Sequence, residues 1–263
     1  AVMTKKANKT DRLLALIRNG RRMTLRQQLQ LTAYLSVPSI IAQFSSIAMQ
    51  YVDASMVGHL GANASASIGL VSTTTWLFWG VCAAVATGFS VQVAHLIGAG
   101  DFVRARQVLR QSLTATLLFS FLLATAGISI SGALPRWLGG DPVIRHDASL
   151  YFLIFSLFLP ALQMNFLAGG MLRCSGNMRI PSLLNVQMCL LDVVFNFFLI
   201  FPTRRVEILD FSFTVPGAGL GVEGAALGTV LAELITAGLM LRYLWYRSPA
   251  PVSYTHIRAH ETK

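Results

Sequence analysis

Two long stretches of this sequence carry no Asp, Glu, Lys or Arg: Leu60 to Gly100 and Gln111 to Pro135. Helices in a soluble core are rarely uncharged over such lengths, whereas about 20 apolar residues are enough to cross a bilayer. Only 12% of the chain is charged and 54% is apolar, while a soluble domain is about 25% charged. The sequence therefore predicts an all-α, polytopic membrane protein.

Six apolar segments predict six transmembrane helices. They lie at residues 31–57, 64–98, 107–132, 148–172, 181–201 and 222–246. The second segment is longer than a bilayer requires, so we expect it to tilt or to project from the membrane. Gly, Asp, Asn and Pro lie at several of the joins between segments, and these residues are typical of turns.

Residues 1–30 form a leader rich in Lys and Arg. Leu13, Leu14 and Ile17 fall on one helical face, so part of the leader is expected to lie along an anionic membrane surface. The alternative is a disordered polybasic tail. The leader lacks a short apolar core followed by a small-residue cleavage site, so we expect no signal peptide.

The basic residues gather at the ends of the predicted spans. The leader shares one side of the membrane with Arg104, Arg106, Arg110, Arg173, Arg179, Arg242 and Arg247. The other side carries Arg136, Arg145, Arg204 and Arg205, together with nearby acids. The positive-inside rule then predicts that both termini are cytoplasmic. This placement explains the net charge of +10 as a topology signal, so we expect no nucleic-acid partner.

Polar residues from four predicted spans fall at a similar depth, in the outer half of the membrane. They are Asp53, Tyr151, Asp192, Asn196 and Thr229. A carboxylate inside a span costs at least a few kcal/mol, which makes Asp53 and Asp192 candidates for function. The alternative for Asp53 is an ordinary helix end in the headgroup layer.

Two carboxylates in a low-dielectric layer favour sharing a proton or a cation, and hydroxyl and amide neighbours can satisfy either state. The cluster is predicted to exchange H⁺ or Na⁺ and to couple that exchange to helix packing. Pro38 and Pro160 each remove a backbone hydrogen bond and are candidate bending points. Alternatively, the polar residues only hold the helices together.

Glu233 lies one turn deeper than Thr229 on the same face. It is a candidate for binding a substrate cation or a second proton, or else a structural acid. Gln50 and Asn165 are further candidates for the same roles. The three cysteines show neither a disulfide framework nor a metal spacing, so we expect no metal and no cofactor besides the coupling ion.

Five motifs in order resemble the MATE (multidrug and toxic compound extrusion) family. They are Pro38 followed by VDASMVGHLG at 52–61, IGAGDFVRARQ at 97–107, GGMLRCSGNMRIP at 169–181, LLDVVFNFFLIF at 190–201 and GVEGAALGTVLAE at 221–233. Together they span nearly all of residues 30–247.

The resemblance implies a secondary transporter, not an enzyme: an antiporter that exports amphipathic, cationic small molecules or drugs. It implies two six-helix lobes around a central cavity in the bacterial cytoplasmic membrane, in contact with lipids. The family's bending proline maps onto Pro38. Its cation site maps onto Asp53, Tyr151, Asp192, Asn196 and Thr229.

The sequence departs from the family pattern in three places. In the archaeal-like branch an asparagine precedes the aspartate of the fifth span by four residues, whereas here Asp192 precedes Asn196, which leaves the choice of H⁺ or Na⁺ open. The loop at 202–220 is longer than usual. Only six spans are present, so 31–247 is expected to be the N-terminal lobe without its C-terminal partner.

The last residues, VSYTHIRAHETK, resemble translated sequencing adapter. We therefore expect 248–263 not to be native.

Two other functions fit less well. A related lipid-linked sugar flippase would line its cavity with cationic residues, but the span interiors here carry acids. An intramembrane aspartyl protease would use Asp53 and Asp192 as a dyad, but the sequences around them lack the Tyr-Asp and Gly-x-Gly-Asp contexts of such enzymes.

Overall fold

The computed structural model describes residues 13, 16, 23–208 and 211–246. In chain order the elements are α2 (Leu25–Gly58), α3 (Ala62–Gly98), α4 (Phe102–Ser131), α5 (Leu134–Trp137), α6 (Arg145–Leu157), α7 (Leu159–Cys174), α8 (Arg179–Leu199), β1 (Pro202–Ile208), β2 (Phe211–Ala218) and α9 (Gly221–Tyr246). Most of the expected leader and all of the expected tail lie outside the described residues.

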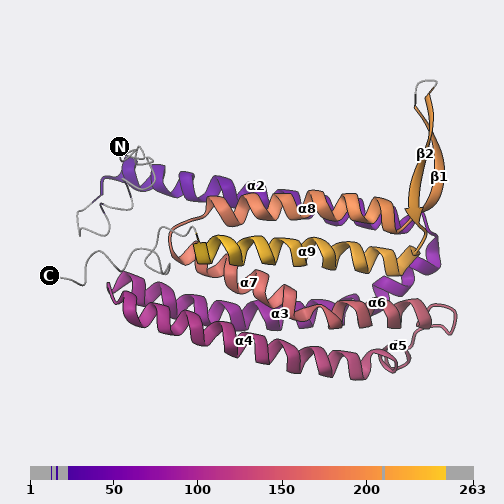
Figure 1. The fold of residues 1–263 in the computed structure, drawn as a ribbon, viewed down its shortest axis with the longest axis horizontal. Helices are drawn as coiled ribbons and strands as arrows, with labels where there is room; N and C mark the ends of the chain where they lie inside the picture. Colours follow the sequence, from indigo (N-terminus) through magenta and orange to yellow (C-terminus); the bar gives the residue numbers. More distant parts are fainter. Residues whose placement is uncertain (1–12, 14–15, 17–22, 209–210, 247–263) are drawn as a thin grey trace.

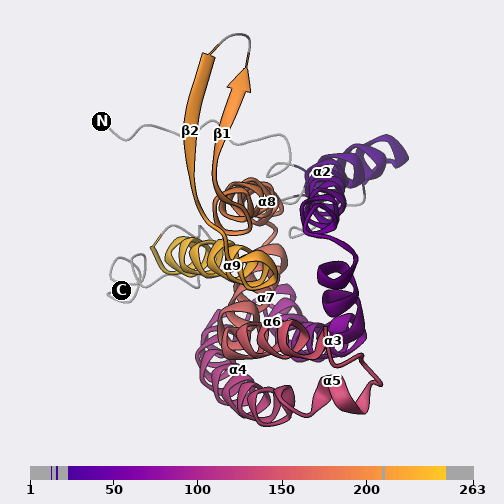
Figure 2. The same ribbon diagram turned by 90° about the vertical axis from the view of Figure 1, so that its right-hand side faces the viewer.

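The long helices lie side by side along a common axis (Figure 1). α8 packs between α2 and α9, and α9 packs on α7. α7 in turn contacts α3 and α4, which pack on each other. α2 lies at one side of the bundle and contacts mainly α8 (Figure 2).

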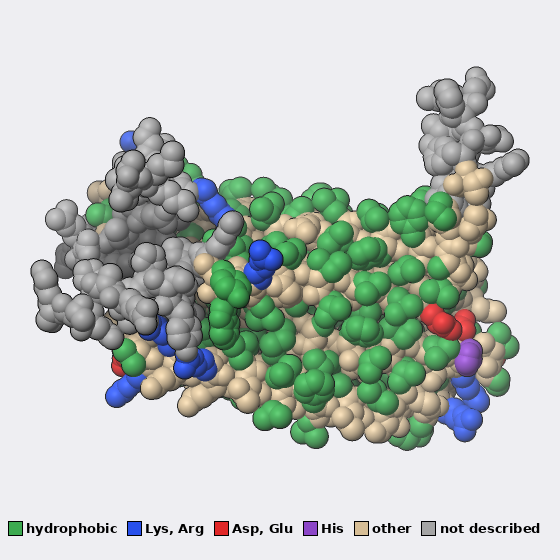
Figure 3. Space-filling view, in the orientation of Figure 1, with side chains coloured by type: hydrophobic (Ala, Val, Ile, Leu, Met, Phe, Trp, Pro, Cys, Tyr) green, Lys and Arg blue, Asp and Glu red, His purple; other side chains and the backbone are tan. Residues whose placement is uncertain are grey.

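Five of the described helices are long and apolar enough to cross a membrane, and a bent pair supplies a sixth span. Apolar side chains cover the flank of the molecule, while most charged side chains gather near its two ends (Figure 3). The prediction of an all-α membrane fold with six spans is therefore confirmed, with one added strand pair.

The fourth span is two helices, α6 and α7, that meet at an angle of 48°. Pro160 lies in the first turn of α7. It has no N–H group, so it cannot donate the hydrogen bond that would continue helix α6. The Phe158 carbonyl accepts from the N–H of Ala161 at 2.9 Å and of Leu162 at 3.3 Å, which starts the new helix.

α3 is the longest helix, with 37 residues. At about 1.5 Å per residue it is roughly 55 Å long, well beyond a hydrocarbon core of about 30 Å. It must therefore tilt strongly or extend past the membrane, as its length in the sequence predicts.

An antiparallel hairpin projects from one end of the bundle between α8 and α9 (Figure 1). The position of residues 202–220 between two apolar spans predicts a loop, although their β-branched and aromatic side chains favour strands. The base of the hairpin is fixed by three backbone bonds: Gly219 N–H to Phe201 O at 3.0 Å, Leu220 N–H to Leu199 O at 2.9 Å and Gly221 N–H to Ile200 O at 3.0 Å. These bonds hold the end of α8 against the start of α9. We call this the hairpin end of the bundle.

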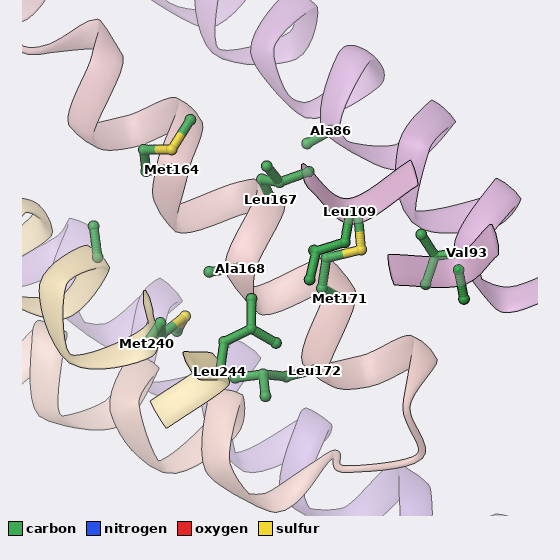
Figure 4. Close-up of a cluster of buried hydrophobic side chains, with 12 residues drawn as sticks. Ala86, Val93, Leu109, Met164, Leu167, Ala168, Met171, Leu172, Met240 and Leu244 are labelled. Carbon is green, nitrogen blue, oxygen red and sulfur yellow. The ribbon is translucent and has the colours of Figure 1, made fainter. Parts of the chain in front are cut away.

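The largest buried apolar cluster joins α7 to α3, α4 and α9 (Figure 4). A second lies between α3, α4 and the α6–α7 break, and a third lies at the hairpin end. α2 contributes only Val57 to the buried members of these clusters. Its position therefore depends little on apolar packing within the described part of the chain.

Candidate functional site: a buried carboxylate pair

The candidate site lies between α2, α8 and α9, towards the hairpin end. Asp192 and Asn196 are one turn apart and therefore share a face of α8. α8 packs along α2, and this face meets Asp53. Two acids that are 139 positions apart in the sequence are thereby brought together.

One amide group joins the two acids. Asn196 Nδ2 donates to Asp53 Oδ1 at 2.9 Å and to Asp192 Oδ2 at 3.2 Å. Asp192 and Asn196 are each only 1% exposed, whereas Asp53 is half-buried. Asp53 is therefore the member of the site nearest to the surface of the described structure.

Two oxygen atoms of the site lack a hydrogen-bond partner within the described residues: Asp192 Oδ1 and Asn196 Oδ1. A buried polar atom without a partner costs about 1–3 kcal/mol, more when it is charged. Both atoms are oxygens, and carboxylate and amide oxygens are ligands for hard cations. The lone pairs of these two oxygens accept no hydrogen bond within the described residues, so they suit a proton or a small cation.

Two further predicted members lie beside the pair. The Thr229 hydroxyl is next to the Asp192 carboxyl and donates to the Ala225 carbonyl of its own helix at 3.1 Å. Tyr151 of α6 lies near both acids and packs on apolar residues of the α3–α6 side and of the hairpin end. The structure thus brings the five predicted site residues together.

The candidates for substrate or a second proton lie apart from one another. Glu233 is half-buried on α9, between Asp192 and Cys82 of α3, and none of the salt bridges among the described residues reaches it. Gln50 is exposed on α2. Asn165 contacts α8, where its Nδ2 lies 3.6 Å from the sulfur of Met188.

The two candidate bending prolines differ. Pro160 follows the 48° break directly. Pro38 lies inside α2, which continues as one helix from Leu25 to Gly58.

Sequence reasoning missed Asn185 and Gly228. Asn185 lies seven residues before Asp192 and thus on the same face of α8, a spacing that would have indicated it. Gly228 precedes Thr229 and packs against the Asn196 side chain, and no sequence signal predicts this contact. Within the described residues, no three His, Cys, Asp or Glu side chains are placed to hold a metal ion.

A family model described as MatE matches residues 38–198, more than half of the chain. The chain belongs to the MatE family. Members of this family are secondary transporters and not enzymes. The matched region contains Asp53, Tyr151, Asp192 and Asn196, so most of the buried site belongs to the MatE region.

This MatE chain is similar to several characterised or named transporters. It is 24% identical over 212 residues to a FAD transporter of Shewanella oneidensis, covering 78% of this chain and 43% of that protein. It is 23% identical over 214 residues to a probable multidrug resistance protein NorM of Thermotoga maritima, covering 81% and 44%.

Solved structures share the MatE fold. A crystal structure of MATE in complex with MaL6 matches with a TM-score of 0.76 and 22% identity, over 97% of this chain and 50% of that one. A MOP superfamily transporter from Pyrococcus furiosus matches with a TM-score of 0.74 and 22% identity, over 97% and 50%. The MatE chain therefore spans about half the length of the proteins it matches.

Proposed function

We propose that the chain is the N-terminal lobe of a cation-coupled exporter, completed by a second lobe of similar size. The family, whose members are secondary transporters, supports the class of activity. The match to about half of each related chain supports the division into lobes.

The buried carboxylate pair carries the proposal. Asp53 and Asp192 share a single NH₂ group, and the adjacent Asp192 Oδ1 and Asn196 Oδ1 have no partner among the described residues. Binding of H⁺ or Na⁺ would neutralise one charge and satisfy these oxygens. Because Asp53 is on α2 and Asp192 is on α8, the bound ion would tighten the contact between the two helices, and its release would loosen it.

The charges of the spans favour a cationic substrate. Within the interiors of the described spans, the ionisable side chains Asp53, Asp192 and Glu233 are acids, and the arginines lie near helix ends. FAD, the cargo named for the Shewanella relative, carries a negatively charged diphosphate, which such acids would repel. We therefore propose export of amphipathic cations.

We propose that the protein lies in the bacterial cytoplasmic membrane with its hairpin end outside. The arginines Arg104, Arg106, Arg110, Arg173, Arg179 and Arg242 lie at the opposite end of their helices, in agreement with the positive-inside rule. The carboxylate pair would then exchange its ion with the outer compartment.

Efflux of ethidium from vesicles that contain the full-length protein tests this function. An imposed proton or sodium gradient should drive efflux, and comparing the two gradients identifies the coupling ion. Asp53→Asn should abolish gradient-driven efflux while membrane insertion remains normal. Efflux at the wild-type rate in that variant would exclude Asp53 from coupling.

A further inference from the structure

A second polar contact joins α2 to α8, away from the carboxylate pair. Asn185 Nδ2 donates to Ser46 Oγ at 2.8 Å and to the Ala42 carbonyl at 3.3 Å. Ser46 Oγ itself donates to the Ala42 carbonyl at 3.1 Å and lies 3.8 Å from the sulfur of Cys189. We call these four residues the Asn185 clamp.

The clamp and the carboxylate pair share one helix register. Ala42 and Asn185, Ser46 and Cys189, and Asp53 and Asn196 are each separated by 143 positions. A constant offset means that matched residues of α2 and α8 lie at matched heights, and Figure 1 shows the two helices running parallel. A slip of one residue would move α2 by about 1.5 Å and would break all three contacts.

Little else fixes this register. Only Leu31, Ala42 and Val57 are buried on α2. Its large apolar side chains are mostly exposed, among them Leu25, Leu29, Val37, Ile40, Ile41, Phe44, Ile47 and Tyr51. In a bilayer such side chains lose nothing by moving along α8, because lipid is as apolar as a neighbouring helix. Directional hydrogen bonds are therefore what can hold α2 in place.

We infer that Asn185 is a positioning residue for the carboxylate pair: it holds α2 on α8 in the register that keeps Asp53 within hydrogen-bond distance of Asn196. This inference rests on the proposed cation site. Asn185 does not touch the two acids, so it acts through the placement of α2.

The clamp also limits what a bend at Pro38 can do. Ala42 and Ser46 lie between Pro38 and Asp53 on α2. While the clamp is closed, bending at Pro38 moves the part of α2 before Ala42. Movement of Asp53 on binding or release of the ion is then confined to the part of α2 beyond Ser46.

The first test is the cation dependence of ethidium efflux by the full-length protein. In Asn185→Ala, the H⁺ or Na⁺ concentration for half-maximal efflux should rise roughly tenfold, the effect of losing about one hydrogen bond, with the maximal rate kept. Gln187→Ala removes an exposed amide from the same helix and should leave the cation dependence unchanged. If the role of Asn185 were purely structural, Asn185→Ala would lower the efflux rate by the same factor at every cation concentration and leave the half-maximal concentration unchanged. That result would overturn the inference.

The second test restores the register without the hydrogen bond. Because Ser46 Oγ lies 3.8 Å from Cys189 Sγ, Ser46→Cys should form a disulfide with the native Cys189 when copper phenanthroline oxidises the two thiols. In the double variant Asn185→Ala, Ser46→Cys, the oxidised protein should regain wild-type cation dependence, and dithiothreitol should reverse the gain. Ser45→Cys, one residue away, should not cross-link to Cys189.

The outcomes separate this inference from the proposed function. Loss of transport when the double variant is oxidised would show that α2 must move along α8 at Ser46. That result would overturn the inference that Asn185 holds α2 in a fixed register. Normal cation dependence in Asn185→Ala would overturn the positioning role alone. Normal cation dependence in Asp53→Asn would instead overturn the proposed cation site.

Discussion

Gly228 on α9 lies so close to Asn196 on α8 that no side chain fits between them. A Cβ atom at Gly228 would overlap Asn196 Oδ1 and would lie 3.0 Å from Asn196 Cγ and 3.1 Å from its backbone nitrogen. The backbone of α9 is therefore one wall of the buried site. It limits how far the Asn196 amide can turn away from the two acids.

Gly228→Ala should disable the site by displacing this amide. Overpacking in a close-packed interior costs about 1–3 kcal/mol, so the variant should be less stable by that amount and should lose cation-dependent efflux. Thermal unfolding in detergent and the efflux assay measure the two effects.

Gly238→Ala is the matched control on the same helix. A Cβ at Gly238 meets nothing within 4 Å, and alanine favours a helix over glycine by about 1 kcal/mol. This variant should be unchanged or slightly more stable. Equal destabilisation of both variants would contradict a specific contact with Asn196.

Asp192→Asn should remove the response to cations and stabilise the empty site. The change removes one of two charges that share a donor, and it replaces Asp192 Oδ1, which has no partner among the described residues, with an NH₂ group beside the Asp53 carboxyl. Without added cation, the variant should be more stable by about 1–3 kcal/mol, the cost of an unpaired buried group. Thermal unfolding across a series of Na⁺ concentrations and pH values measures this.

Asp141→Asn, in the exposed loop before α6, is the control for this change. It should keep the wild-type response to cations, because it lies away from the pair. A wild-type cation response in Asp192→Asn would show that Asp192 is not a ligand.

The fold and the common height of the site residues along the bundle were predictable, because both follow from spacing along single helices. Uncharged stretches indicate spans, and the positions of Asp53 and Asp192 within them indicate a shared layer. Spacing does not give the angle at which each helix faces its neighbour. For that reason the sequence does not show that Gln50, a candidate for binding substrate or a second proton, is exposed on α2, or that Gly228 contacts Asn196.

The hairpin and the break in the fourth span show a second limit. Residues 202–220 include strand-forming types, but their place between two apolar spans predicts a loop. At the break, Pro160 indicated a bend, while the two separate helices α6 and α7 follow from how Phe158 and its neighbours share hydrogen bonds. The choice of hydrogen-bond partners at the break depends on side-chain packing, which a single sequence does not show.

Gly127→Ala should destabilise the packing of α4 on α6. A Cβ at Gly127 would lie 2.5 Å from Ser156 Oγ, 2.9 Å from Ser156 Cβ and 3.2 Å from a ring carbon of Phe78. The free energy of unfolding should fall by about 1–3 kcal/mol, as measured by denaturation in detergent. Gly132→Ala, whose Cβ meets nothing within 4 Å, should not show this loss.

Gln163→Leu should make the protein more stable. Gln163 is 0% exposed on α7, and neither Nε2 nor Oε1 has a hydrogen-bond partner within the described part of the chain. Replacing the amide with an apolar side chain of similar size removes an unpaired polar group, so the free energy of unfolding should rise by about 1–3 kcal/mol. Gln163→Glu has nearly the same shape but adds an acid, and it should lower stability. A fall in stability for Gln163→Leu would show that the amide has a bound partner, such as a buried water, and that this part of α7 is a polar site and not a packing defect.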